Sequence, residues 1–174
     1  ELIPNIEYTR QSEFSFDGNI KGKHIVCRED IFNNYFMNEI SSFKKRLIIY
    51  SAFMTEARLS TLIPAFADAI NKGKQIVVVT KALSDRGKSE VSQYKKCEDE
   101  LRAIGVNVIH KKGMHEKLIF VDSKAVWIGS LNALSFTGLT GEIMQRHEDR
   151  DLTAEYEKLF DIEHICETIE KTYE

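Results

Sequence analysis

The sequence has little of what membrane proteins, disulfide scaffolds and zinc clusters need. Its 174 residues contain no apolar run of the roughly 18 to 20 residues that a helix needs to cross a bilayer. The three cysteines, Cys27, Cys97 and Cys166, are odd in number, far apart and without a CxxC pair, so we expect free thiols. An initiator Met and a signal-peptide pattern are also missing. We therefore expect a cytoplasmic piece of a larger protein with no membrane partner.

Compositional bias and an excess of one charge are absent as well. Hydrophobic residues make up 43% of the chain and charged residues 29%, which excludes intrinsic disorder, collagen-like repeats and coiled coils. The net charge of -3 gives no general attraction for polyanions. The charge is uneven, however: residues 74–117 carry ten basic and six acidic side chains, and residues 142–174 carry four and eleven. We expect one domain over residues 1–174, basic in the middle and acidic toward the C-terminus.

The hydrophobic periodicity predicts strands that alternate with helices. Strands are expected at 46–54, 75–80 and 106–110, helices at 55–72 and 90–104, an edge strand at 23–28, and further helices at 30–43 and 152–173. Pro64 either moves the start of its helix to about Ser60 or kinks it. Short strand–helix–strand connections require parallel pairing through right-handed crossovers. The predicted fold is α/β, with a mixed, mostly parallel sheet flanked by helices on both faces.

The segment MHEKLIFVDSKAVWIGSLN, residues 114–132, predicts a β-hairpin. If Ser123 and Lys124 form a two-residue turn, cross-strand pairing places four polar side chains on one face, with His115 opposite Asn132 and Lys117 opposite Ser130. Such a group suits a core poorly, because buried polar atoms need partners. It suits a phosphodiester well, since lysine and asparagine donate to phosphoryl oxygens and histidine attacks phosphorus or moves a proton.

The spacing of this segment resembles the HxKx4D...GSxN signature of the phospholipase D superfamily at every defined position. The order of strands and helices extends the resemblance over most of the chain. It implies a phospholipase D-like fold and a phosphohistidine intermediate. The implied roles are a nucleophile, His115; ligands of the phosphoryl oxygens, Lys117 and Asn132; an assisting hydroxyl, Ser130; and structural positions, Asp122 and Gly129.

The resemblance also implies an acidic residue that orients the imidazole, for which Glu142 is the first candidate and Glu148 the second. Family members build one site from two motifs, and this chain has one, so a homodimer is implied. One His115 would attack while His115 of the partner subunit protonates the leaving oxygen, with no metal or other cofactor. The run 133–146 resembles domains attached to DNA helicases and restriction-type proteins, which are therefore expected in the parent chain.

Five basic residues near the ends of predicted strands are candidates for holding a nucleic-acid backbone: Lys81, Arg86, Lys88, Lys111 and Lys112. A solvated surface is the alternative reading. Single-motif relatives are mostly nucleases, so we expect a metal-independent nuclease that acts on nucleic acid, on DNA rather than RNA. A phospholipid phosphodiesterase is disfavoured by the absence of an interfacial helix, and a catalytically silent dimerisation or binding module remains an alternative.

Overall fold

The computed structural model describes residues 24–135 and 141–172, the last three of them by their backbone alone. Lys23 and Tyr173, expected in the edge strand and in the last helix, lie outside the described residues, as do positions 136–140 of the run 133–146. One seven-stranded sheet has the order β1-β7-β6-β5-β2-β3-β4. Its strands are β1 (His24–Arg28), β2 (Arg46–Ser51), β3 (Gln75–Lys81), β4 (Asn107–Lys111), β5 (Lys117–Val121), β6 (Ala125–Gly129) and β7 (Ile143–His147).

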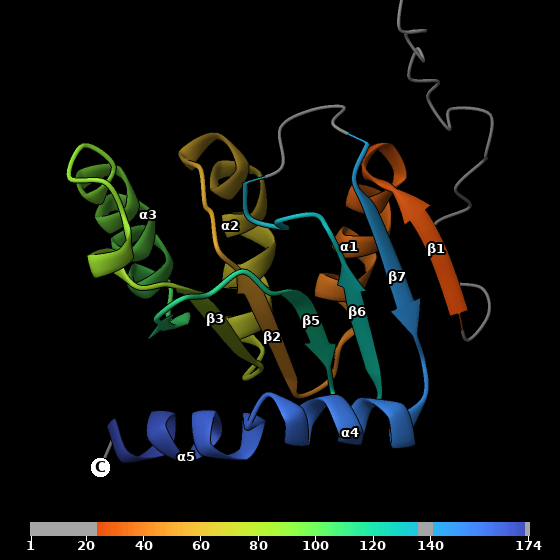
Figure 1. The fold of residues 1–174 in the computed structure, drawn as a ribbon. Coiled ribbons are helices and arrows are strands. Elements are labelled where there is room, and N and C mark those ends of the chain that lie inside the picture. The colour runs from red at the N-terminus through yellow and green to blue at the C-terminus, as the bar shows by residue number, and fades with distance from the viewer. Residues whose placement is uncertain (1–23, 136–140, 173–174) are drawn as a thin grey trace, which may run out of the picture.

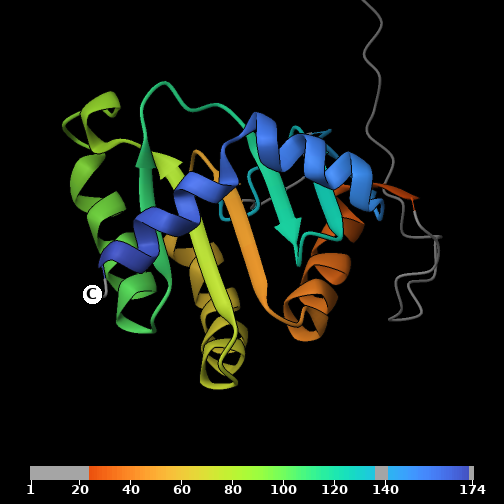
Figure 2. The same cartoon turned by 90° about the horizontal axis from the view of Figure 1, so that it is seen from below.

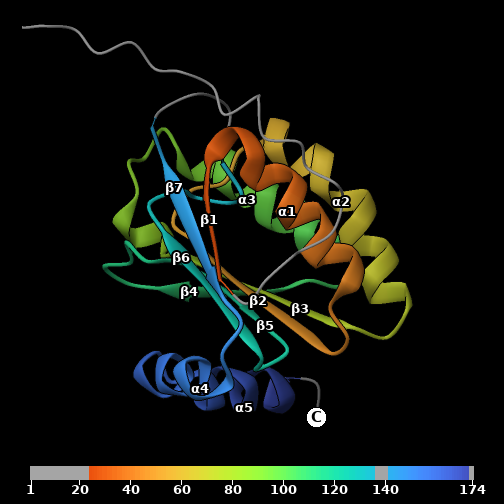
Figure 3. The ribbon, with the colours of Figure 1, turned by 90° about the vertical axis from the view of Figure 1, so that its right-hand side faces the viewer.

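Helices cover both faces of this sheet, which confirms the predicted mixed α/β fold. Figure 1 shows α4 and α5 below the sheet, and Figure 3 shows them on the side opposite α1 and α2. None of the described helices is both long and apolar enough to cross a membrane. The helical segments are α1 (Glu29–Ser42), α2 (Glu56–Asn71), a short 3-10 turn η1 (Leu83–Asp85), α3 (Val91–Ala103), α4 (Arg150–Leu159) and α5 (Ile162–Thr172).

The sheet is not mostly parallel, and this part of the sequence prediction is wrong. Only β2 with β3 and β3 with β4 pair in parallel, while the other four pairings are antiparallel. The periodicity identified the crossover strands correctly, but it did not show where the hairpin β5–β6 would attach. That hairpin joins the sheet beside β2, and β7 and β1 then extend the sheet on the same side in antiparallel order.

The core consists of two layers, one on each side of the sheet. In the layer under α1 to α3, Trp127 is fully buried and meets Phe32 edge-on at 5.5 Å between ring centroids. In the layer under α4 and α5, Tyr50, Phe120 and Phe160 contact one another edge-on. Figure 2 shows α4 and α5 crossing this second face as two successive segments. Both faces of the central strands are therefore shielded from water.

Two helix boundaries differ from the sequence prediction. The expected helix 152–173 is divided at Asp161, whose φ of 52° is left-handed and interrupts the helical hydrogen bonds. Helix α2 begins at Glu56 and contains Pro64, so a start near Ser60 is wrong. The hydroxyl of Thr55 accepts a hydrogen bond from the N–H of Arg58 and caps this helix at its first turn.

The carboxylate of Asp122 anchors the hairpin to the start of β2. It accepts hydrogen bonds from the backbone N–H groups of Lys44 at 2.6 Å, Lys45 at 2.7 Å and Arg46 at 2.9 Å. The N–H of Asp122 in turn donates to the carbonyl of Arg46 at 3.0 Å. Burial raises the pKa of the Asp122 carboxyl, but these donors more than offset burial and hold the pKa below its ordinary value.

The hairpin connection contains three residues, so the predicted register is wrong by one position. Val121 pairs with Ala125, and Leu118 pairs with Ile128. Asp122 and Ser123 both have left-handed backbones, with φ of 53° and 50°, and this makes room for the extra residue. In this register Lys117 faces Gly129 rather than Ser130.

We predict that Asp122→Asn lowers the free energy of unfolding by about 1.5 to 3 kcal/mol at neutral pH, because the charged acceptor is lost while the shape of the side chain is kept. A depressed pKa contributes stability at neutral pH that disappears as the pH falls through the folded-state value. The difference from wild type should therefore shrink on acidification. Urea denaturation between pH 7 and pH 3 measures it.

The matched control is Asp161→Asn, which makes the same substitution at an exposed aspartate with a left-handed backbone. It should leave stability nearly unchanged. Equal losses in the two variants, or a loss at Asp122 that does not depend on pH, would contradict an ionised anchor.

Candidate active site

An open pocket of about 510 Å³ lies at the edge of the sheet where β5 begins and β6 ends. The last residue of β2, Ser51, pairs with Lys117 at this edge, so the carboxyl end of a central strand also opens here. Six of the residues singled out in the sequence line the pocket: His115, Lys117, Gly129, Ser130, Asn132 and Glu142. These residues come from three separate chain segments, and Leu118, Ile128 and Phe160 supply an apolar part of the same concave surface.

The polar side chains converge even though the predicted register was wrong. His115 precedes the first residue of β5, and Ser130 and Asn132 follow the last residue of β6. All three lie beyond the paired part of the hairpin, so strict alternation between faces does not set their direction. The ends of the two strands, and not cross-strand pairing, bring these groups together.

Asn132 is held by the chain that leaves β2. Its Oδ1 accepts a hydrogen bond from the N–H of Ala52 at 3.0 Å. The hydroxyl of Ser51 supports the same turn, because it donates to the carbonyl of Phe53 at 2.8 Å and accepts from the N–H of Leu134 at 3.2 Å. With the amide oxygen engaged, the NH₂ group of Asn132 remains as a double donor for an anionic ligand.

Gly129 and Ser130 lie directly against the start of β7. The N–H of Ser130 donates to the carbonyl of Ile143 at 3.0 Å, and its hydroxyl accepts from the N–H of Ile143 at 3.1 Å. A Cβ on Gly129 would come within 2.1 Å of the same carbonyl and 2.7 Å of Sδ of Met144. Only glycine allows this approach, which places Ser130 beside Glu142 at the pocket.

His115 is exposed, and no hydrogen bond to its imidazole occurs within the part of the chain that the structure describes. Lys117 lies beside it, with Nζ donating to the carbonyl of His115 at 2.6 Å. The imidazole nitrogens are thus accessible to a ligand. Lys117 is half-buried, and its ammonium group can reach the same ligand.

The structure separates the two acidic candidates. Glu142 lines the pocket with His115, although no hydrogen bond joins the two side chains. Glu148 lies beyond the other end of β7 and binds Lys124 at 2.7 Å and Arg146 at 2.9 Å. It cannot orient His115, so this second candidate is wrong.

Sequence reasoning did not identify the ion pair between Glu116 and Lys111, which borders the pocket. Glu116 lines the pocket between His115 and Lys117, accepts a hydrogen bond from the N–H of His115 at 2.9 Å, and pairs with Lys111. Burial raises the pKa of Glu116, but the hydrogen bonds from Lys111 and the backbone outweigh burial and lower the pKa. The sequence gave no reason to expect this ion pair, because a carboxylate is unfavourable beside a site that binds anions.

The basic candidates do not act as one group. Lys81 and Lys111 are neighbours across β3 and β4, and Lys88 and Lys112 are exposed. Arg86 is only 9% exposed, donates to the carbonyl of Ala52 and to Thr80, and stacks on the ring of Tyr94 at 3.4 Å. The prediction that Arg86 binds substrate is wrong, because its guanidinium supports the turn after β2 from inside.

Comparisons with known proteins identify the family and the fold of this chain. Residues 36–163 match the family model described as "Cardiolipin synthase, PLD-like domain". The chain resembles the structure of Nuc, a phospholipase D family member from Salmonella typhimurium, at 16% identity and a TM-score of 0.60, over 79% of this chain and 90% of that one. It is similar to NucT from Helicobacter pylori at 15% identity and a TM-score of 0.55, over 79% and 91% of the two chains.

TrmBL2, an archaeal chromatin protein whose structure shows a mode of DNA binding, is similar at 11% identity and a TM-score of 0.56. The match covers 81% of this chain and 52% of TrmBL2. No curated protein matches the chain. At these identities the structural matches establish a shared fold. The family match covers most of the sequence and establishes the family.

We predict that Gly129→Ala lowers the free energy of unfolding by about 1 to 3 kcal/mol, because the added methyl group must push β7 away from β6. The shift also displaces Ser130 from Ile143. Urea denaturation measures the loss. Gly87→Ala is the control, since its Cβ would meet Glu90 at an ordinary 3.7 Å and should cost little; similar losses in both variants would argue against a tight approach at Gly129.

Proposed function

The chain belongs to the family of phospholipase D-like domains, and with it to phosphodiesterases of that type; on this premise we propose that it is a nuclease that cleaves DNA in preference to RNA without a metal ion. The observation that carries the proposal is the convergence of His115, Lys117, Ser130, Asn132 and Glu142 on one pocket. These residues offer a nucleophile, a cation, two neutral polar groups and a carboxylate. That set matches what a phosphodiester needs for in-line displacement.

In the proposed reaction, a nitrogen of His115 attacks phosphorus and forms a P–N bond while the P–O bond to the leaving oxygen breaks. Lys117 and the NH₂ group of Asn132 stabilise the charge on the non-bridging oxygens, with Ser130 assisting. Glu142 orients the imidazole. Water then attacks the phosphohistidine, which releases the phosphate end and restores free His115. The leaving oxygen in the first step needs a proton, which this half-site does not provide.

We assign that proton to His115 of the partner subunit in a homodimer. Two features of the surface support this assignment. His115 is exposed at the pocket, and two apolar side chains beside the pocket, Phe53 and Ile143, are 40% and 43% exposed. Both apolar residues adjoin the site: the N–H of Ala52, next to Phe53, donates to the side chain of Asn132, and the N–H of Ile143 donates to the hydroxyl of Ser130. A second copy placed over this edge would cover both apolar groups and complete the acid–base pair.

The flank of the pocket suits the backbone of nucleic acid. Lys81 lies at the carboxyl end of β3 beside Lys111, which is paired with Glu116, and the exposed Lys112 continues the same edge. Lys111 Nζ also lies 5.5 Å from the ring centroid of Phe160, which lines the pocket. Cations beside a phosphodiester site favour a polyanion over an isolated diester. We further propose that residues 1–174 form one cytoplasmic domain joined to helicase or restriction-type domains.

We predict that the chain cleaves bis(p-nitrophenyl) phosphate and DNA in EDTA, and that His115→Asn reduces both rates by about 10³-fold or more, because the nucleophile is removed. Rates on single- and double-stranded DNA, RNA and phosphatidylcholine vesicles measure the preference. His164→Asn, at an exposed position on α5, should retain full activity.

If the protein hydrolyses lipid alone, the nuclease proposal is wrong and the protein is a phospholipid phosphodiesterase. If none of the substrates is cleaved by the dimeric wild-type protein, the catalytically silent binding module is correct instead.

We also predict that sedimentation shows a particle of two chains, and that activity depends on pairs of intact subunits. When wild type and His115→Asn are co-expressed in equal amounts, activity per wild-type chain should fall by about half, because random pairing leaves only half of the wild-type chains with an intact partner. Co-expression with His164→Asn should cause no loss. Activity strictly proportional to the number of wild-type chains would show that each chain acts alone.

A further inference from the structure

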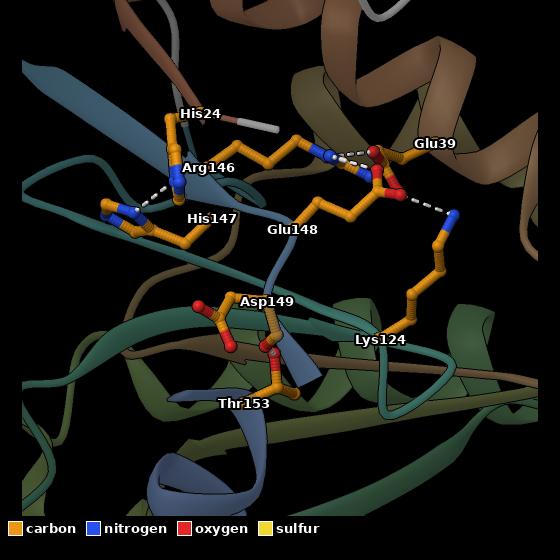
Figure 4. Close-up of polar contacts among 8 residues, drawn as sticks. All are labelled: His24, Glu39, Lys124, Arg146, His147, Glu148, Asp149 and Thr153. Carbon is orange, nitrogen blue, oxygen red and sulfur yellow. Dashed lines mark hydrogen bonds and ion pairs between the residues drawn. The ribbon is translucent and has the colours of Figure 1, made fainter. Parts of the chain in front are cut away.

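Two histidines face each other across the edge of the sheet, at the end of β7 that is remote from the pocket. His24 in β1 and His147 in β7 are direct cross-strand partners. Their Nδ1 atoms lie 3.1 Å apart, and their ring centroids are 5.3 Å apart at an angle of 57° between planes (Figure 4). Ile143, next to Ser130, begins β7, and His147 ends it. Three residues of strand lie between Ile143 and His147, which are about 13 Å apart along β7.

The two nitrogens lie at hydrogen-bond distance, and the same separation also fits two ligands of a single metal ion. Zinc binds imidazole nitrogen at about 2.0 to 2.1 Å, so two ligands on one ion lie about 3.0 to 3.4 Å apart, depending on the angle at the metal. The observed 3.1 Å falls within that interval. The backbone hydrogen bonds between β1 and β7 hold the two residues side by side. A large part of the entropy that would be lost by bringing them together around an ion is therefore already lost on folding.

The surroundings of the pair leave room for an ion and its water. A surface pocket of about 450 Å³ lies beside His24 and is also lined by Lys124, Glu148, Asp149 and Arg150. The ammonium group of Lys124 is held by Glu148, which also binds Arg146, while Arg150 and Asp149 add one positive and one negative group to the same lining. Figure 4 shows the carboxylate of Asp149 below the ring of His147. Its Oδ1 accepts two N–H groups at the start of α4, which hold this carboxylate among the residues that line the pocket with His24.

The geometry points to a surface site for one divalent first-row transition-metal ion, Zn²⁺ in the first instance, held by Nδ1 of His24 and Nδ1 of His147. Among the described residues no group of three or more metal-binding side chains occurs, so water fills the remaining coordination positions. This site plays no part in the proposed hydrolysis, which takes place at the other end of β7.

A bound ion would join the edge strand to the rest of the sheet. β1 has β7 as its one neighbour in the described sheet. The side chain of Val26, midway along β1, is 69% exposed, so few apolar contacts hold this face of the strand. An ion that bridges His24 and His147 adds a cross-strand link at the end of this ladder, and it stabilises the folded state in proportion to its affinity.

The test is a titration of the full chain, first freed of metal with EDTA and then dialysed, with ZnCl₂ by calorimetry and thermal melting. We expect one Zn²⁺ per chain and a rise in melting temperature of about 5 to 10 °C at a hundredfold excess of free Zn²⁺ over the dissociation constant. Mg²⁺, which prefers oxygen ligands, should have no effect. His24→Ala and His147→Ala should each remove the zinc-dependent rise.

Controls separate this site from the pocket and from other histidines. His164→Ala and His110→Ala should bind Zn²⁺ as the wild type does, and so should His115→Asn. In EDTA, His24→Ala and His147→Ala should melt within about 2 °C of wild type, since both side chains lie at a partly exposed edge. Should one of them fail to fold, His24→Gln, which keeps a polar side chain of similar size, takes its place.

Absence of zinc binding by the wild type, or binding that persists in both variants of the pair, would overturn the site. Zinc binding that is lost only in His115→Asn would place the ion in the pocket and overturn it as well. Hydrolysis in EDTA by His24→Ala is expected at the wild-type rate, so a failure of the metal site and a failure of the nuclease proposal remain distinguishable.

Discussion

The structure depends above all on the attachment of one hairpin to the centre of the sheet. The carboxylate of Asp122 binds three consecutive backbone N–H groups where the chain enters β2. This contact fixes the turn of the hairpin at one edge of the sheet, and the length of β5 and β6 then determines where the other ends lie. Because β5 begins and β6 ends at the carboxyl end of β2, the residues just outside the two strands meet at the pocket.

Close backbone contacts hold several of the residues that line the pocket. Gly129 lets β7 approach within a distance that excludes a Cβ, and the turn after β2 holds the carboxamide of Asn132 by its oxygen. Arg86 supports that turn from beneath. The reactive side chains are therefore placed by rigid backbone, which suits a site that must hold a phosphoryl group in one orientation.

Much of the fold could be predicted from periodicity, because buried strands and amphipathic helices leave local patterns. The left-handed backbones of Asp122, Ser123 and Asp161 leave none, so the register of the hairpin and the break between α4 and α5 were not predicted. Arg86 looked like a surface cation in the sequence, but it is buried and contacts Ala52, Thr80 and Tyr94. A long-range contact of that kind has no local signature.

The sequence alone determined the identity and order of the chemical groups. The spacing from His115 to Asn132 indicated the family, and the apolar runs indicated the class of fold. Only the tertiary structure decided which groups meet. It brought Glu142 and Phe160 to the pocket, removed Glu148 and Arg86 from it, and set His24 against His147. The physical reason is that spacing along the chain records local geometry, whereas the meeting of distant segments depends on how the sheet orders its strands.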